Sequence, residues 1–128
     1  MLLVYIHLFT VLPAALLGAW LLARKKGTSV HKTLGRAYVA LMMLSSAVSL
    51  FLPANVGPRV LGHFGVIHLL SLLVLCALPV AVIAARQRRL ARHRRTMILV
   101  FVGGIAIAGT LTLVPGRLLH QWLIAWWW

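Results

Sequence analysis

The sequence contains no aspartate and no glutamate, although its 128 residues include 13 lysines and arginines. A Ser–His–Asp triad or a pair of acid–base carboxylates cannot be assembled without carboxylates, so hydrolytic chemistry of these kinds is excluded. A pump that relays protons through intramembrane Asp or Glu is disfavoured for the same reason. A soluble protein of this composition would also have little polar surface to show to water.

Cysteine is almost absent as well. The single Cys76 lies within an apolar stretch, so it cannot form an intramolecular disulfide, and no Cys/His spacing typical of zinc sites occurs. A copper site built from thioether and imidazole groups is a minor alternative, because the methionines do not group with the histidines along the chain. These methionines are Met1, Met42, Met43 and Met97.

Apolar residues, by contrast, are abundant. They make up 62% of the chain, and the mean hydropathy is +1.01, whereas soluble domains are usually about 45–50% apolar. Four apolar stretches are long enough to cross a bilayer. Because unpaired backbone groups are costly in lipid, each stretch should be a helix. The sequence therefore predicts an all-α fold, a four-helix transmembrane bundle in one domain, residues 1–128, with spans at about 2–23, 33–53, 60–85 and 96–114.

The positive charges are concentrated in two of the connections between these stretches. The positive-inside rule then places both connections in the cytoplasm, next to anionic lipid head groups, and both termini on the outer side. Charges placed in this way also argue against nucleic-acid binding. Arg59 and Arg117 lie toward the other side. The two basic connections hold Arg24, Lys25, Lys26, Lys32 and Arg36, and Arg86, Arg88, Arg89, Arg92, Arg94 and Arg95.

Two further segments complete this topology. The stretch LPANVGPRV, residues 52–60, is rich in proline and glycine and is predicted to be the outer turn between the second and third spans. The closing segment, residues 115–128, should be an interfacial tail, because indole rings prefer the level of the head groups. Its tryptophans are Trp122, Trp126, Trp127 and Trp128.

The chain also repeats itself. A shift of 61 residues places Ile6-His7-Leu8 on Ile67-His68-Leu69, and a shift of 62 places His31-Lys32 on His93-Arg94. We interpret this as a helical hairpin used twice, at about 2–53 and 60–114, with the copies related by an axis along the membrane normal. A chance match between apolar helices is the alternative.

The repeat pairs His7 with His68 on the outer side and His31 with His93 on the cytoplasmic side. Helices 1 and 3 are diagonal in an up-down bundle, as are helices 2 and 4, and bundles place cofactors between facing helices. Haem iron takes two neutral imidazoles as axial ligands. We therefore predict haem b at one or both pairs and no other metal, whereas His63 and His120 should be interfacial. In the alternative, each histidine only hydrogen-bonds to a neighbouring helix.

Several motifs resemble a known family. The segments KGTSVHKTLGRAYVALMM, IHLLSLL, RHRRTMI and AGTLTLVPGR are similar to small bacterial inner-membrane proteins of the domain of unknown function 2306. The H-x-x-L-G-R-x-Y-V stretch from His31 to Val39 and the closing P-G-R, residues 115–117, are the most specific parts. The resemblance implies a multi-pass protein of the bacterial inner membrane, and it implies no activity. A looser likeness to four-helix di-haem b-type cytochromes is an analogy of architecture alone.

Two functional hypotheses follow. In the first, the protein is a haem-binding electron-transfer protein, a b-type cytochrome rather than an enzyme, with a redox or complex partner. In the second, it is a cofactor-free structural or accessory membrane subunit.

Overall fold

A computed structural model describes residues 1–54 and 58–127 of the chain. Residues 55–57 of the predicted outer turn and Trp128 of the predicted tail lie outside the described residues. Within the described part the regular elements are helical, and the one β-bridge joins Val60 to Phe64. The helices are α1 (Leu2–Ala23), α2 (Ser29–Ser49), α3 (Val66–Arg86), α4 (Leu90–Phe101), the π-helix η1 (Val102–Ile107), α5 (Ala108–Thr112) and α6 (Leu118–Trp127).

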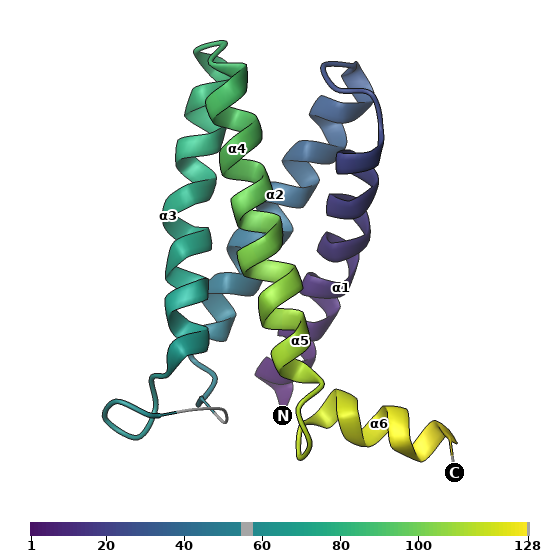
Figure 1. Ribbon diagram of the computed structural model, residues 1–128, viewed down its shortest axis with the longest axis vertical. Helices are drawn as coiled ribbons and strands as arrows, with labels where there is room; N and C mark the ends of the chain where they lie inside the picture. The colour runs from purple at the N-terminus through teal and green to yellow at the C-terminus, as the bar shows by residue number, and fades with distance from the viewer. Residues whose placement is uncertain (55–57, 128) are drawn as a thin grey trace.

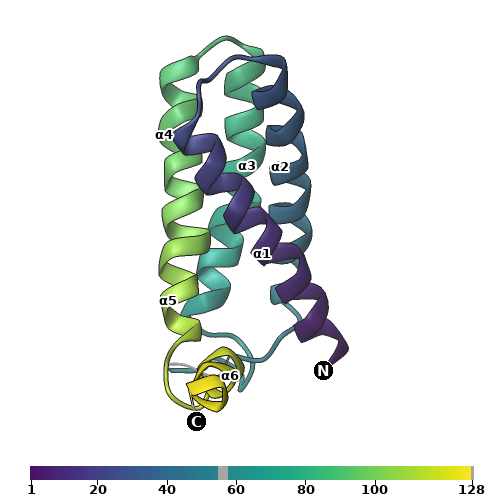
Figure 2. The same cartoon turned by 90° about the vertical axis from the view of Figure 1, so that its right-hand side faces the viewer.

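The long helices lie side by side (Figure 1). α1 packs mainly on α2, α2 on α3, and α3 on the continuous α4–η1 segment, so neighbours in sequence are neighbours in space. Both termini lie at one end of the molecule, and the two basic connections lie at the other (Figure 1). α1 runs obliquely: it approaches α4 near the basic end and diverges from α5 toward the terminal end (Figure 2).

Three helical segments of the described chain are long and apolar enough to cross a membrane: Leu2–Ala23, Val66–Arg86 and Leu90–Thr112. Their outward side chains are apolar, and Leu16 of α1 and Leu69 of α3 are 75% and 65% exposed. Such a surface suits lipid rather than water. α2 has a similar length but does not reach this hydropathy, since Lys32, Arg36 and four serines interrupt it.

The boundaries of α2 differ from the predicted stretch 33–53. The hydroxyl of Thr28 accepts a hydrogen bond from the backbone N–H of His31 at 3.0 Å, which caps the helix and starts it at Ser29. The helix then ends at Ser49. Hydropathy marks where lipid-facing side chains lie, whereas capping marks where the backbone turns.

The predicted span 60–85 begins too early, because residues 60–65 form a turn and α3 begins at Val66. Leu61 and Gly62 have φ angles of 54° and 71°, in the left-handed region, where Leu61 is strained and glycine is at ease. Val60 donates its N–H to the carbonyl of Phe64 at 2.7 Å, and Ala54 donates to that of His63 at 2.8 Å. The apolar composition of this turn concealed it.

The last predicted span, 96–114, begins too late, because polar residues at the start of the helix concealed it. The basic segment from Leu90 onward is already helical, so α4 extends out of the apolar stretch by about a turn and a half. The π-helix η1 then continues α4, and α5 ends at Thr112. Gly104 of η1 lies tightly against α2 and α3: a Cβ there would be 2.7 Å from Val74 Cγ2 and 3.0 Å from Met42 Cε.

The core lies where the helices converge, at mid-height and toward the basic end. Tyr38 and Met42 of α2, Val74 and Leu78 of α3 and Val100 of α4 are its largest buried apolar side chains.

Candidate functional site

A cavity of about 160 Å³ lies among the helices in the half of the molecule that carries the termini. An engineered cavity of about this size in another protein holds benzene, whereas drug-sized ligands need about 300–1,000 Å³. The cavity therefore has room for a small ring or a short chain without rearrangement. Most of its lining is apolar, and the polar side chains that reach it are His7, Ser45, Ser46, Ser49, Ser71 and Thr112.

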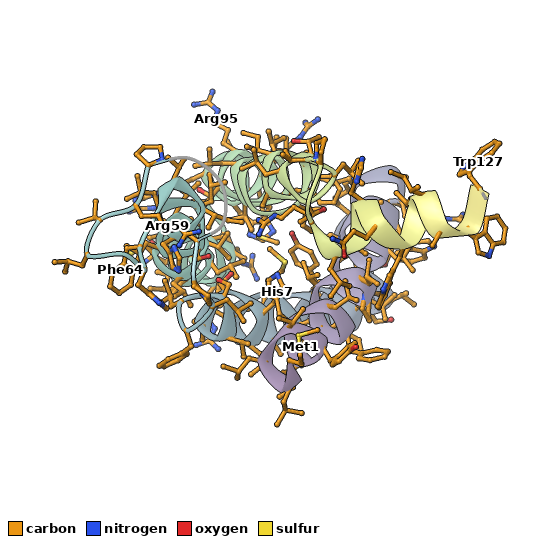
Figure 3. The ribbon with its side chains drawn as sticks, turned by 90° about the horizontal axis from the view of Figure 1, so that it is seen from below. Met1, His7, Arg59, Phe64, Arg95 and Trp127 are labelled. Carbon is orange, nitrogen blue, oxygen red and sulfur yellow. The ribbon has the colours of Figure 1, made fainter. Side chains whose placement is uncertain are left out.

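His7, on α1, is the one histidine of the described residues that lines this cavity. Figure 3, which views the molecule from the terminal end, shows it near the middle of the bundle. Its Nδ1–H donates to the carbonyl oxygen of Ser45 on α2 at 3.1 Å, and the Ser45 hydroxyl lies 3.0 Å from the same nitrogen. No hydrogen bond engages Nε2 within the described part of the chain. Fixing one ring nitrogen on a carbonyl, with the other left as a lone pair, is typical of metal-ligating histidines.

His68, the predicted partner of His7, is placed differently. Its Nε2–H donates to the carbonyl of Leu52 at 2.8 Å, and its Nδ1 accepts the N–H of Gly65 at 3.1 Å. The ring is only 3% exposed and packs against the rings of His63 and Phe64, at centroid distances of 5.4 and 5.2 Å. Both nitrogens are therefore engaged, and His68 does not line the cavity into which His7 points.

His63 joins the same cluster instead of standing alone at the interface. Its Nε2–H donates to the carbonyl of Leu50 at 3.0 Å. Leu50 and Leu52 lie just after the end of α2. By binding their carbonyls, the imidazoles of His63 and His68 fasten the α2–α3 connection to the start of α3.

His31 and His93 lie together at the basic end, on α2 and α4. His93 donates Nδ1–H to the carbonyl of Ala81 on α3 at 2.8 Å, and its Nε2 makes no hydrogen bond to the described residues. The Nδ1 of His31 is buried without a partner. Burial lowers the pKa of His31 below 6.5, and the nearby charges of His93 and Lys26 lower it further. This pair therefore keeps uncommitted ring nitrogens, and neither ring lines the cavity described above.

A seam of serines crosses from α2 to α3 beside the cavity. The Ser49 hydroxyl donates to the carbonyl of Ser46 at 2.7 Å, and the Ser71 hydroxyl donates to the carbonyl of Ile67 at 3.3 Å. The two hydroxyls also form a hydrogen bond with each other at 2.5 Å. The sequence analysis did not assign these serines to a site. The available signal was the run of three serines within five residues of an apolar helix.

The remaining candidate ligands are scattered. Within the described residues, no group of three or more His, Cys, Asp or Glu side chains lies close enough to hold a metal ion. Cys76 is exposed on α3. Met42 and His7 both line the cavity, although they are far apart along the chain.

A comparison with protein families matches residues 4–125, nearly the whole chain, to the model described as predicted membrane protein (DUF2306). No curated protein and no solved structure gives a significant match. The chain is accordingly a membrane protein, and its helices supply three candidate spans in the described residues.

Proposed function

We propose, from the premise that this chain belongs to the DUF2306 family of predicted membrane proteins, that it is a haem-binding electron-transfer protein of the bacterial inner membrane. The observation that carries the proposal is the state of His7. Its Nδ1–H is held by the Ser45 carbonyl, and its unengaged Nε2 belongs to a side chain that lines a central, largely apolar cavity. Bundles commonly build cofactor sites in this position.

Binding a macrocycle at His7 requires two local changes. The cavity of about 160 Å³ must widen, and we propose that α1 and α5, which both line it and diverge toward the terminal end, move apart. For His68 to serve as a second ligand, one of its ring nitrogens must be freed from its present partner, the Leu52 carbonyl or the Gly65 N–H. When bound, haem would supply one-electron redox chemistry, while the protein supplies the ligands and the apolar surroundings.

The inner pair supports the same proposal in another way. His93 is held on the Ala81 carbonyl as His7 is held on Ser45, and His31 has a buried Nδ1 without a partner. We propose His31 and His93 as ligands of a second haem. That site also needs space to be opened, because the cavity described above does not reach it.

The topology belongs to this proposal as well. Because α2 lies beside α1 and α3 and is as long as they are, we propose that it is a fourth span, giving a four-helix bundle built from two repeated hairpins. Eleven of the 13 basic residues lie at one end, which supports a cytoplasmic position for that end and an outer position for both termini.

A specific observation favours a second candidate, a cofactor-free structural or accessory subunit. His63 and His68 both bind carbonyls just after α2, so their visible role is to fasten one helix connection. In this candidate the histidines tie helices together, and the protein acts through a partner subunit in the membrane.

One spectrum separates the two candidates. The protein is expressed with haem supplementation, purified in a mild detergent and examined as a dithionite-reduced minus oxidised difference spectrum. We expect Soret and α bands that are reduced in His7→Ala and retained in the matched control His120→Ala, which changes a histidine of α6 outside the cavity. A wild-type protein without these bands contradicts the haem proposal and favours the accessory subunit.

A further inference from the structure

Arg117 occupies an unusual position for a cation. It follows Pro115 and Gly116, and Gly116 has a φ of 91°, a left-handed conformation that glycine adopts without strain. This turn redirects the chain, so that α6 runs across the end of the molecule and not along α5 (Figure 1). Arg117 comes just before Leu118, where α6 begins. The P-G-R motif therefore fixes the position of one specific side chain.

Arg117 lies in the turn between two residues of the cavity lining. Thr112, before the turn, and Leu119, after it, both line the cavity. Arg117 is not itself a lining residue, so the turn places its guanidinium beside the terminal end of the cavity.

The guanidinium is partly withdrawn from water and incompletely paired. Its Nε is buried and has no hydrogen-bond partner among the described residues. Burial also lowers the pKa of Arg117, yet a guanidinium remains charged. No Asp or Glu exists in the chain, so no acidic side chain of this protein can pair with it. A half-buried cation of this kind calls for an anion from outside the chain.

We propose that Arg117 and the cavity form a binding site for an anionic amphiphile, with its carboxylate or phosphate on the guanidinium and its apolar part in the cavity. The fork of N–H donors on arginine matches both head groups. The unengaged Nε2 of His7 provides a second polar contact within the same space. The apolar lining and the small volume select a short acyl chain or one end of a longer one.

This inference goes beyond the proposed function because it requires no iron. It differs from the general attraction of basic loops to acidic lipid, since it places one recognised head group at the end of the molecule that is poor in charge. Arg59 lies at that same end, but in the α2–α3 connection and not in the turn that joins Thr112 to Leu119, and so provides a matched control cation.

The test uses haem-free protein in a neutral maltoside detergent, with bound ligand counted by native mass spectrometry. The probes are decanoate, decyl phosphate and the matched neutral ester methyl decanoate, with inorganic phosphate as a head group without a chain. We expect one anionic amphiphile bound per chain, carboxylate or phosphate, and clearly weaker binding of methyl decanoate and of inorganic phosphate. The comparison of decanoate with decyl phosphate identifies which head group is preferred.

Variants then localise the site. Arg117→Gln should weaken binding of the preferred anion about tenfold or more, because a hydrogen bond to a charged group is lost. Arg117→Lys, which keeps the charge, should lose less, and Arg59→Gln should bind as wild type. Equal binding by Arg117→Gln and wild type overturns the proposal, as does an equal loss in Arg59→Gln. Methyl decanoate or inorganic phosphate binding as tightly as decanoate in wild-type protein overturns it without any variant. The haem spectrum is a separate readout, so the two proposals fail independently.

Discussion

Gly18 of α1 is the position where the packing of this bundle can be tested most directly. A Cβ built on Gly18 would lie 2.7 Å from Phe101 Cδ2 and 2.8 Å from Tyr38 Cε2. Both distances are shorter than carbon atoms tolerate, and Tyr38 is only 2% exposed, so its ring has little room to move. Gly18→Ala must therefore push α1 away from α2 and α4.

The magnitude follows from a matched pair of substitutions. Overpacking a well-filled core by a methyl group costs about 1–3 kcal/mol. Replacing glycine by alanine within a helix also gains about 0.5–1 kcal/mol of backbone entropy. Gly35→Ala on α2 shares that gain, but its Cβ would have no heavy atom within 4 Å. The difference between the two variants isolates the overpacking cost, and we expect Gly18→Ala to be less stable than Gly35→Ala by about 1–3 kcal/mol.

The assay is reversible unfolding in mixed micelles, in which a neutral detergent is replaced stepwise by dodecyl sulfate and helicity is followed by circular dichroism. Gly109→Ala serves as a second control, because its Cβ would also have no heavy atom within 4 Å. If Gly18→Ala proves as stable as Gly35→Ala and Gly109→Ala, the close approach of α1 to Tyr38 and Phe101 is wrong.

Three further predictions concern other parts of the molecule. A double-mutant cycle of Ser49→Ala and Ser71→Ala should give a coupling energy of about 0.6 kcal/mol, and additive effects in the same unfolding assay would refute the hydrogen bond between them. In a cysteine-free background, an impermeant maleimide should label Leu61→Cys on intact cells and Lys26→Cys only after permeabilisation; the reverse pattern would invert the topology. Because His31 has a lowered pKa in the folded protein, the unfolded chain takes up its proton first as the pH falls, so stability should decrease below about pH 6.5. Circular dichroism at graded pH should show a smaller decrease for His31→Gln, and an unchanged pH profile would contradict the burial of this ring.

The sequence predicted the bounds of a helix correctly where the apolar stretch and the helix begin and end at the same residues. The apolar stretch 2–23 matches α1 because its composition changes where its backbone turns. α2 and α4 begin in polar segments, through the Thr28 cap and the basic turns after Leu90, and hydropathy does not register either signal. The turn at 60–65 is made of apolar residues, so its composition resembles that of a span.

The candidate site was predicted less completely than the helices. The sequence singled out His7, and the structure places it on a cavity wall. The partners of His68 are the carbonyl of Leu52 and the N–H of Gly65. Both are backbone groups, which every residue type carries, so residue identities do not predict these contacts. The repeat predicted from the sequence would also give His7 and His68 equal surroundings. However, the α2–α3 connection lies against His68, and its Leu52 carbonyl accepts a hydrogen bond from that ring.

The π-helix η1 acts as a change of register between the two halves of the last long segment. An extra residue held within a helix turns everything after it by about 100° relative to an uninterrupted α-helix. Gly104, Ala108 and Thr112 reach the cavity wall from η1 and α5, so their orientation depends on that added residue. Deleting one residue between Val102 and Ile107 would restore regular α-helical hydrogen bonds while rotating Thr112 and the P-G-R turn away from the cavity. The length of this segment, and not only its composition, therefore determines which side chains face inward.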